Sequence, residues 1–324
     1  MADSHFLCQV IALQRISIDC LAIVRVDQGM MRRRCILSLH LCIWLGWTAA
    51  LSAHQTPAPL RNEPTVATPT PVRICYQDSA LFPYFSGDGH QLPTTRPGAT
   101  IEHLQYLFAR IPSTTPTFQR LPWQRCLKYL SDGKVDLVVA NYNIMRRSIG
   151  RYPPVPMGAG DDAAPDPAYA LTHQDVCLAT SSRLAMRWNG KNFSGMNKVT
   201  VAHPQSKMAL PPSEQMKMVP YPLQDYSLAP ELLEEGRIDA MAVVCRIRGL
   251  DAVPKELKHP NFTVLEPPIY VHRGYLVFSH QFANAQPQLV QQIWHQQRQL
   301  ELQAATSQAL DAIYQSYLSS PRTE

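Results

Sequence analysis

The residues best suited to chemistry in this sequence are three arginines that lie close together. Arg146, Arg147 and Arg151 fall within the segment MRRSIGRYP. A guanidinium group is planar and carries paired N–H donors, so it fits a carboxylate at two points in a way that no other side chain does. Arg147 is therefore a candidate for binding a carboxylate. The alternative is a surface arginine in a basic loop with Arg146 and Arg151.

Motifs of the common enzyme classes are missing from the chain after residue 53. It contains no GxSxG, HExxH or GxGxxG sequence and no Walker loop. The histidines, among them His103, His173, His203 and His272, are scattered, and no CxxC pair or zinc-type spacing of cysteines and histidines occurs. We therefore predict that the protein is not an enzyme and has no catalytic residue, metal site or cofactor.

The N-terminal segment predicts export to the periplasm. From Met31 the chain reads MRRRCILSLHLCIWLGWTAALSA, in which three arginines precede an apolar run that ends in small residues at Ala53. This is the pattern of a secretory signal peptide, and the alternative is a membrane anchor of minimal length. We interpret residues 1–53 as an overlong gene start followed by a signal peptide that is cleaved near Ala53. Residues 54–71 contain five prolines and are expected to form a proline-rich tether.

One sequence pattern occurs twice, as LSDGKVDLVVA at residues 130–140 and as LEEGRIDAMAV at residues 233–243. Each copy predicts the end of a helix, a turn and the start of a buried strand. Gly133 and Gly236 fall where a helix needs a left-handed C-cap, and the apolar run after each aspartate has the length and content of a strand. Two copies indicate two similar α/β lobes, as does the length of 324 residues.

Strands and helices are predicted to alternate on both sides of a loop rich in Pro, Gly and Asp at residues 153–167, as expected for mostly parallel sheets with covering helices. Strands are predicted at 72–77, 117–121, 135–142, 170–180, 198–203, 218–221, 238–245 and 269–280. Helices are predicted at 99–111, 123–130, near 206–210, at 228–236 and in the C-terminal tail.

Four cysteines follow the predicted cleavage site, at positions Cys75, Cys126, Cys177 and Cys245. An even number of cysteines in an oxidising compartment favours disulfides. The sequence alone leaves three pairings open. Proximity within the proposed lobes favours Cys75 with Cys126 and Cys177 with Cys245, and four separately buried thiols are the alternative.

From Arg73 to about Tyr317 the chain resembles the periplasmic solute-binding proteins of family 3, typified by the polar amino-acid binding proteins of ABC transporters. The resemblance rests on the order and spacing of RICYQDSALFPYF, PGATIEHL, LPWQRCL, DGKVD, MRRSIGRYP and EEGRID. It implies the type 2 periplasmic-binding architecture, in which two α/β lobes, each a mostly parallel sheet flanked by helices, are joined by two crossing strands. We accordingly expect the first lobe at 72–168, the second lobe at 169–270, and a return to the first lobe with C-terminal helices at 271–324.

The resemblance also implies a ligand site in the cleft between the lobes. Arg147, five residues before Tyr152, matches the arginine that grips the ligand carboxylate in similar amino-acid binders. Val244 stands where those proteins have a carboxylate for the ligand ammonium, so the ligand is expected to differ from a standard amino acid, because a buried unpaired ammonium is costly. Asp136 and Asp239 each begin a strand and are expected to be structural.

Six further residues are candidates for contact with the ligand. The aromatic ones can cover a ring-bearing or apolar part of it, the asparagines follow a strand whose end faces the cleft, and the serine begins a predicted helix whose N–H groups could hold an anion. They are Phe82, Tyr84, Trp123, Asn141, Asn143 and Ser206. Core packing is the alternative for each aromatic residue, and HPQSK at residues 203–207 lacks the glycine-containing turn usual in the family, which puts Ser206 in doubt.

The function that the resemblance implies is periplasmic binding of a small amino-acid-like or carboxylate-bearing solute. The lobes would close on it by a hinge motion and deliver it to the membrane component of an ABC transporter. The alternative is a sensor or interaction protein that presents a ligand or a surface to a membrane receptor. Nucleic acid is not expected as a partner, because the net charge is only +5 and no basic stripe interleaved with aromatic residues occurs.

Overall fold

The computed structural model describes residues 68–160, 162–205 and 217–320. The predicted signal segment, most of the tether, the predicted helix near 206–210 and Ser206 lie outside these residues. Among the helices that the structure describes, none has the length and apolar character needed to cross a membrane.

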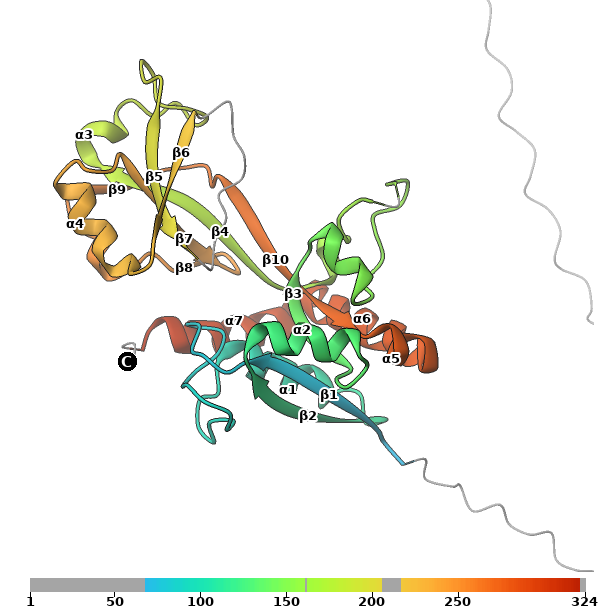
Figure 1. Ribbon diagram of the computed structural model, residues 1–324. Coiled ribbons are helices and arrows are strands. Elements are labelled where there is room, and N and C mark those ends of the chain that lie inside the picture. The colour runs from blue at the N-terminus through green and yellow to red at the C-terminus, as the bar shows by residue number, and fades with distance from the viewer. Residues whose placement is uncertain (1–67, 161, 206–216, 321–324) are drawn as a thin grey trace, which may run out of the picture. The chain divides into compact units, whose positions relative to one another are not determined.

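The first lobe contains a four-stranded part of the sheet in the order β2-β1-β3-β10 (Figure 1). β1 pairs in parallel with both β2 and β3, whereas β10 runs antiparallel to β3. The bounds are Thr70–Gln77 for β1, Thr114–Leu121 for β2, Leu137–Asn141 for β3 and Tyr270–Phe278 for β10.

Helices from both ends of the described chain build the core of this lobe. Leu104 and Leu107 of α1 are buried in one cluster with Ile293 and Trp294 of α6, at the helical spacing that the sequence shows. The helices are α1 (Ala99–Phe108), α2 (Trp123–Ser131), α5 (His280–Ala285), α6 (Pro287–Leu302) and α7 (Ala304–Leu318), with short 3-10 turns η1 (Ile144–Ser148) and η2 (Pro167–Tyr169).

The second lobe repeats this plan with strand order β6-β5-β7-β4. β5 pairs in parallel with β6 and β7, and β4 runs antiparallel to β7. The strands are β4 (Ala170–Ser181), β5 (Val199–Pro204), β6 (Met218–Leu223), β7 (Ala240–Ile247), β8 (Leu250–Asp251) and β9 (Phe262–Val264). The helical segments are α3 (Ser182–Ala185), α4 (Ala229–Glu234), η3 (Tyr226–Leu228) and η4 (Lys255–Leu257).

The repeated sequence pattern has the same structure in both lobes, as predicted. Gly133 and Gly236 follow α2 and α4, and both have φ of 68°, in the left-handed region. The aspartate that follows is structural in each copy, because it ties β3 to β1 in the first lobe and β7 to β5 in the second. Asp136 Oδ2 accepts from the Arg73 N–H at 2.8 Å, and Asp239 Oδ2 accepts from the Thr200 N–H at 2.7 Å.

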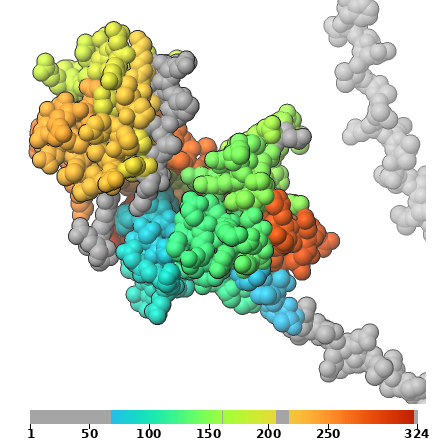
Figure 2. All heavy atoms as spheres, viewed as in Figure 1, coloured from blue at the N-terminus to red at the C-terminus, as the bar shows by residue number. Residues whose placement is uncertain are grey.

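Two crossing strands join the lobes. β4 and β10 pair antiparallel with each other and so connect the two parts into one sheet of ten strands. In Figure 2 the atoms of the first lobe are coloured blue to green and red, and those of the second lobe mostly yellow to orange. The structure therefore confirms the predicted α/β architecture of two lobes and two crossing strands.

Each lobe is cross-linked by one disulfide. Cys75 and Cys126 join β1 to α2, and Cys177 and Cys245 join β4 to β7. All four cysteines are buried in the hydrophobic core. The pairing favoured by proximity is the one observed.

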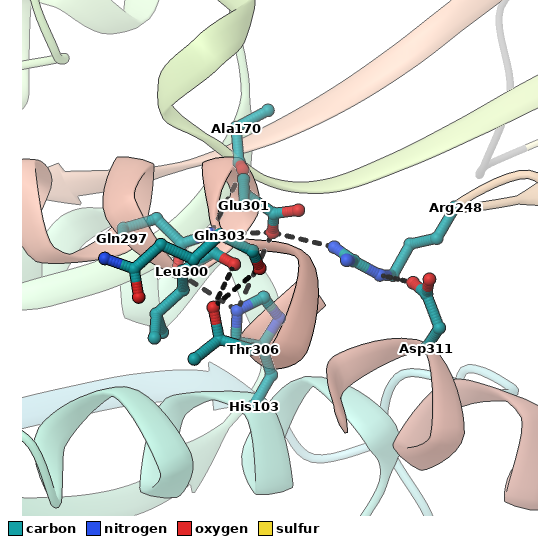
Figure 3. A network of polar contacts seen from close by, with 9 residues as sticks. All are labelled: His103, Ala170, Arg248, Gln297, Leu300, Glu301, Gln303, Thr306 and Asp311. Carbon is teal, nitrogen blue, oxygen red and sulfur yellow. Dashed lines mark hydrogen bonds and ion pairs between the residues drawn. The ribbon is translucent and has the colours of Figure 1, made fainter. Parts of the chain in front are cut away.

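A buried ion-pair network ties the β7–β8 turn to the C-terminal helices (Figure 3). Arg248 lies in this turn with φ of 53°, and its side chain is 2% exposed. It donates to Glu301 of α6 at 2.7 Å and to Asp311 of α7 at 2.8 Å. Because Arg248 follows a second-lobe strand and both carboxylates belong to helices of the first lobe, the network links the two lobes away from the crossing strands.

The same network holds a buried histidine in its neutral form. His103 of α1 is fully buried, and its Nε2 lies 3.1 Å from Oε1 of Gln297. The Gln297 amide donates to Ala170 O and to Glu301 Oε1, so its oxygen faces the histidine and accepts the Nε2–H. Burial, with the nearby positive charge of Arg248, lowers the pKa of His103 to about 3.

We predict that Arg248→Ala lowers the free energy of unfolding by about 3 kcal/mol, because it leaves two carboxylates without the cation that they share in a largely buried place. Arg246→Ala is the matched control. Arg246 also pairs with two carboxylates, Asp175 and Glu266, but it is 34% exposed, so we expect a loss of about 1 kcal/mol or less. Urea unfolding at pH 7 measures both, and equal losses would contradict a special role for Arg248.

The low pKa of His103 in the folded protein predicts that the free energy of unfolding falls in mild acid. Its pKa is about 3 in the folded protein and about 6.5 in the unfolded chain, so the unfolded state takes up the proton first as the pH falls. Stability is then lost between pH 6.5 and 3 at about 1.4 kcal/mol per pH unit from this group. We expect His103→Gln to remove that part of the slope in urea unfolding at pH 6, 5 and 4. An unchanged slope would show that other groups carry the acid sensitivity.

Candidate functional site

A cavity of about 410 Å³ is lined by residues of both lobes and of the crossing strands. This volume falls within the range of roughly 300–1,000 Å³ that small-molecule sites occupy. The second lobe contributes Pro204 at the end of β5 and Val244 in β7. The remaining walls come from the first lobe, from β4 and from β10.

The crossing strands supply one wall through alternate residues. Thr172 and Gln174 of β4 and His272 and Gly274 of β10 line the cavity. His272 lies opposite Gln174, and Gly274 lies opposite Thr172. Because side chains two apart on a strand share a face, the register of this one pair places all four residues at the cavity.

Gly274 keeps space open in that wall. A Cβ at this position would lie 2.5 Å from Thr172 Oγ1 and 3.3 Å from a methyl group of Val139. The first distance is shorter than any normal contact, so a larger residue must displace the threonine.

Aromatic side chains form a second wall. Phe82, Tyr84, Phe85 and Trp123 line the cavity, and the first two and Trp123 are aromatic candidates that the sequence singled out. The Tyr84 hydroxyl donates to Oε1 of Gln174 at 2.5 Å. Burial raises the pKa of Tyr84 well above its usual range, so the hydroxyl stays protonated and fixes the Gln174 amide with its NH2 group unused.

The arginine at the cavity is Arg146, whereas Arg147 is not among its lining residues. Arg146 donates to the Asn141 carbonyl at 3.2 Å and lies 6.0 Å from the Trp123 ring centre. Arg147 lies over the ring of Tyr142 at 5.9 Å, and its carbonyl is 3.0 Å from Nε2 of His280. Both arginines belong to the 3-10 turn η1, in which consecutive side chains diverge by about 120°.

The two asparagines have different positions. Asn141 lines the cavity, and its Nδ2 donates to Nδ1 of His272 at 2.9 Å. Asn143 is an N-cap of η1, with Oδ1 accepting from the Met145 N–H at 2.9 Å, and it is not a lining residue. Ser206 cannot be placed, because it lies outside the described residues.

His272 is a hydrogen-bond donor at neutral pH. Burial lowers its pKa below the usual value of about 6.5, so the ring is neutral at pH 7. Since Nδ1 accepts from Asn141, the ring proton lies on Nε2. The sequence interpretation treated His272 as one of several scattered histidines and did not single out Thr172 or Gln174. These residues occupy alternate positions on β4 and β10, and only the register of the two strands shows that they lie opposite one another.

Among the described lining residues, the side chain that carries a full charge at neutral pH is a cation. They include the cation of Arg146 and no aspartate or glutamate. Arg146 forms no ion pair with any carboxylate that the structure describes. An arginine in this setting has the charge and the N–H donors that an anion needs.

Comparisons with known proteins support the fold. The sequence matches no protein-family profile, and no curated protein is significantly similar to it. Among solved structures, the L-cystine solute receptor of Neisseria gonorrhoeae in its unliganded open conformation is similar, with 13% identity over 79% of this chain and 97% of that chain and a TM-score of 0.50. An ancestral cationic amino acid solute-binding protein, AncCDT-1, has 16% identity over 77% and 96% of the two chains, with a TM-score of 0.49. Substrate-binding domain 2 of Lactococcus lactis GlnP, also open, has 14% identity over 79% and 99%, with a TM-score of 0.48. The chain thus has the two-lobe fold of type 2 periplasmic binding proteins.

Gly274 provides a test of the cavity wall. We expect Gly274→Ala to lower the free energy of unfolding by about 1–3 kcal/mol, because the new methyl group overlaps the Thr172 hydroxyl. The double variant Gly274→Ala, Thr172→Ala lacks that hydroxyl. Its free energy of unfolding should therefore be close to that of the single variant Thr172→Ala. Additive losses in urea unfolding would contradict the close contact between these two residues.

Proposed function

We propose that the protein binds a small solute with an anionic group, amino-acid-like or a carboxylate-bearing metabolite, in the cavity between its lobes. The observation that carries the proposal is the position of Arg146, a cation without a carboxylate partner in the described chain, in a cavity lined by both lobes. The rest of the cavity fits this use, since the crossing strands and aromatic walls surround the arginine with neutral groups.

Hinge motion of the lobes is the second part of the proposal. β4 and β10 connect the lobes, and Pro204 and Val244 of the second lobe border the cavity. A ligand held by the first lobe at Arg146 gains contacts with these second-lobe residues when the lobes close. Closure also removes water, which strengthens the attraction between the guanidinium and the anion.

Delivery to the membrane component of an ABC transporter is the role that accords with this binding mode. For it we assign residues 1–53 to the gene start and signal peptide and residues 54–71 to a tether, with maturation near Ala53 in the periplasm. Residues 72–168 and 271–324 then form the first lobe and residues 169–270 the second. The two disulfides accord with an oxidising compartment.

Arg146 is the decisive residue to test. A thermal-shift screen of the chain from residue 54 onward against amino acids, organic acids, polyamines and small peptides should give a rise in Tm with anionic compounds, because a ligand stabilises the state that it binds. Arg146→Ala should weaken binding of any hit by about 10- to 100-fold, since a hydrogen bond to a charged group contributes about 1.5–3 kcal/mol.

Arg147→Ala is the matched control, because it removes the same charge one residue away. It should leave the affinity within about threefold of the unmodified protein, as measured by isothermal titration calorimetry. Loss of binding in Arg147→Ala with full binding in Arg146→Ala would reverse the assignment. A panel without any hit would remove the support for solute binding.

A further inference from the structure

Resting on the proposed function, we infer that the ligand is an anion without an ammonium group: a small carboxylate carried on a flat, apolar body. This class differs from the zwitterionic amino acids. The inference rests on the unused hydrogen-bond donors of the cavity, on the lack of a carboxylate among its described lining residues, and on the aromatic wall.

The cavity offers several donors that have no partner in the described chain. The NH2 group of Gln174 remains unused, because the amide oxygen is the atom that Tyr84 engages. Nε2–H of His272 is likewise unpaired, because the asparagine contact involves Nδ1. Arg146 has five N–H donors and uses them for the Asn141 carbonyl and the Tyr152 hydroxyl, so further donors remain for a ligand. All three donors belong to residues that line the cavity, where they can bond to an anion.

Thr100 adds a buried hydroxyl to this set. The residue is 1% exposed and lines the cavity, and its hydroxyl lies beside that of Tyr314. A hydroxyl has one donor and two acceptor lone pairs, so it can also bond to a ligand oxygen that reaches it.

The acceptors that the described lining residues offer an ammonium group are neutral. Val244 presents an apolar side chain from the second lobe, and the described lining residues include no carboxylate. The Gln174 oxygen is taken by Tyr84, and the Asn141 carbonyl already accepts from Tyr152 and Arg146. The neutral side-chain acceptors that remain are Oε1 of Gln77, Oδ1 of Asn141 and the hydroxyl groups of Thr100 and Thr172. Neutral oxygens without a carboxylate do not offset the cost of burying a positive charge beside Arg146.

The aromatic wall selects the shape of the ligand body. Phe82, Tyr84, Phe85 and Trp123 are among the residues that line the cavity. Aromatic faces pack best against flat, apolar groups, which bury a large area without a directional partner. A ligand that places its carboxylate at Arg146 and a ring or an unsaturated chain against the aromatic residues would contact both parts of the cavity.

Three compounds that differ by one group test the inference. We would measure binding of 3-phenylpropanoate, L-phenylalanine and 2-phenylethylamine by isothermal titration calorimetry at pH 7, with 4-methylpentanoate and L-leucine as the aliphatic pair. We expect 3-phenylpropanoate to bind at least tenfold more tightly than L-phenylalanine and 2-phenylethylamine to show no binding. 4-Methylpentanoate should bind more weakly than 3-phenylpropanoate but more tightly than L-leucine.

Val244→Asp is the variant that should reverse the preference, because it supplies a carboxylate for the ammonium group. The ratio of affinities for L-phenylalanine and 3-phenylpropanoate should rise at least tenfold, and Val244→Asn, of the same shape without the charge, should leave it unchanged. If the buried aspartate prevents folding, Gln174→Glu replaces it. That substitution keeps an acceptor for Tyr84 and should weaken 3-phenylpropanoate at least tenfold.

The outcomes separate this inference from the proposed function. Equal or tighter binding of L-phenylalanine or L-leucine by the unmodified protein, or an unchanged ratio in a folded Val244→Asp variant, would overturn the ligand class. Arg146-dependent binding of other compounds, with none of these five bound, would also overturn it and leave the proposed function standing. Failure of these compounds and of the whole screening panel would count against both.

Discussion

The antiparallel pairing of β4 with β10 is the interaction on which the rest of the structure depends. It joins the two lobes into one sheet, and its register places Thr172, Gln174, His272 and Gly274 on the face that lines the cavity. A shift of one residue would turn these side chains to the opposite face of the sheet. Construction of the site therefore depends on the register of the two crossing strands.

Each lobe has the same two kinds of internal cross-link, an aspartate hydrogen bond between strands and a disulfide. The crossing strands connect the two lobes. Asp136 ties β3 to β1, Asp239 ties β7 to β5, and one disulfide cross-links each lobe. The Arg248 network adds a second link between the β7–β8 turn and the C-terminal helices. A binding protein that closes about a hinge needs rigid lobes and a limited number of connections, and this arrangement meets both requirements.

Local sequence signals predicted the fold well. The glycine of the repeated pattern acts within its own turn, so Gly133 and Gly236 identified the helix ends, and the apolar runs identified β3 and β7. The order of elements then implied two lobes, which in turn favoured the disulfide pairing that the structure contains.

The cavity was harder to predict, because it depends on side-chain direction and on pairing between distant residues. Arg146 and Arg147 are adjacent and chemically identical, and only the geometry of η1 decides which lines the cavity. Gln174 and His272 are separated by 98 residues, and nothing in either local sequence fixes their alignment. Val244 lines the cavity, and only the resemblance to amino-acid binders singled it out in the sequence.

Compaction on ligand binding is the most direct test of the claim that both lobes hold an anion at Arg146. Small-angle scattering of the chain from residue 54 onward would be recorded with and without the compound that gives the largest Arg146-dependent thermal stabilisation. We predict that the radius of gyration falls when the unmodified protein is saturated and that it stays constant in Arg146→Ala under the same conditions. An unchanged radius in the saturated, unmodified protein would contradict closure of the lobes around the ligand.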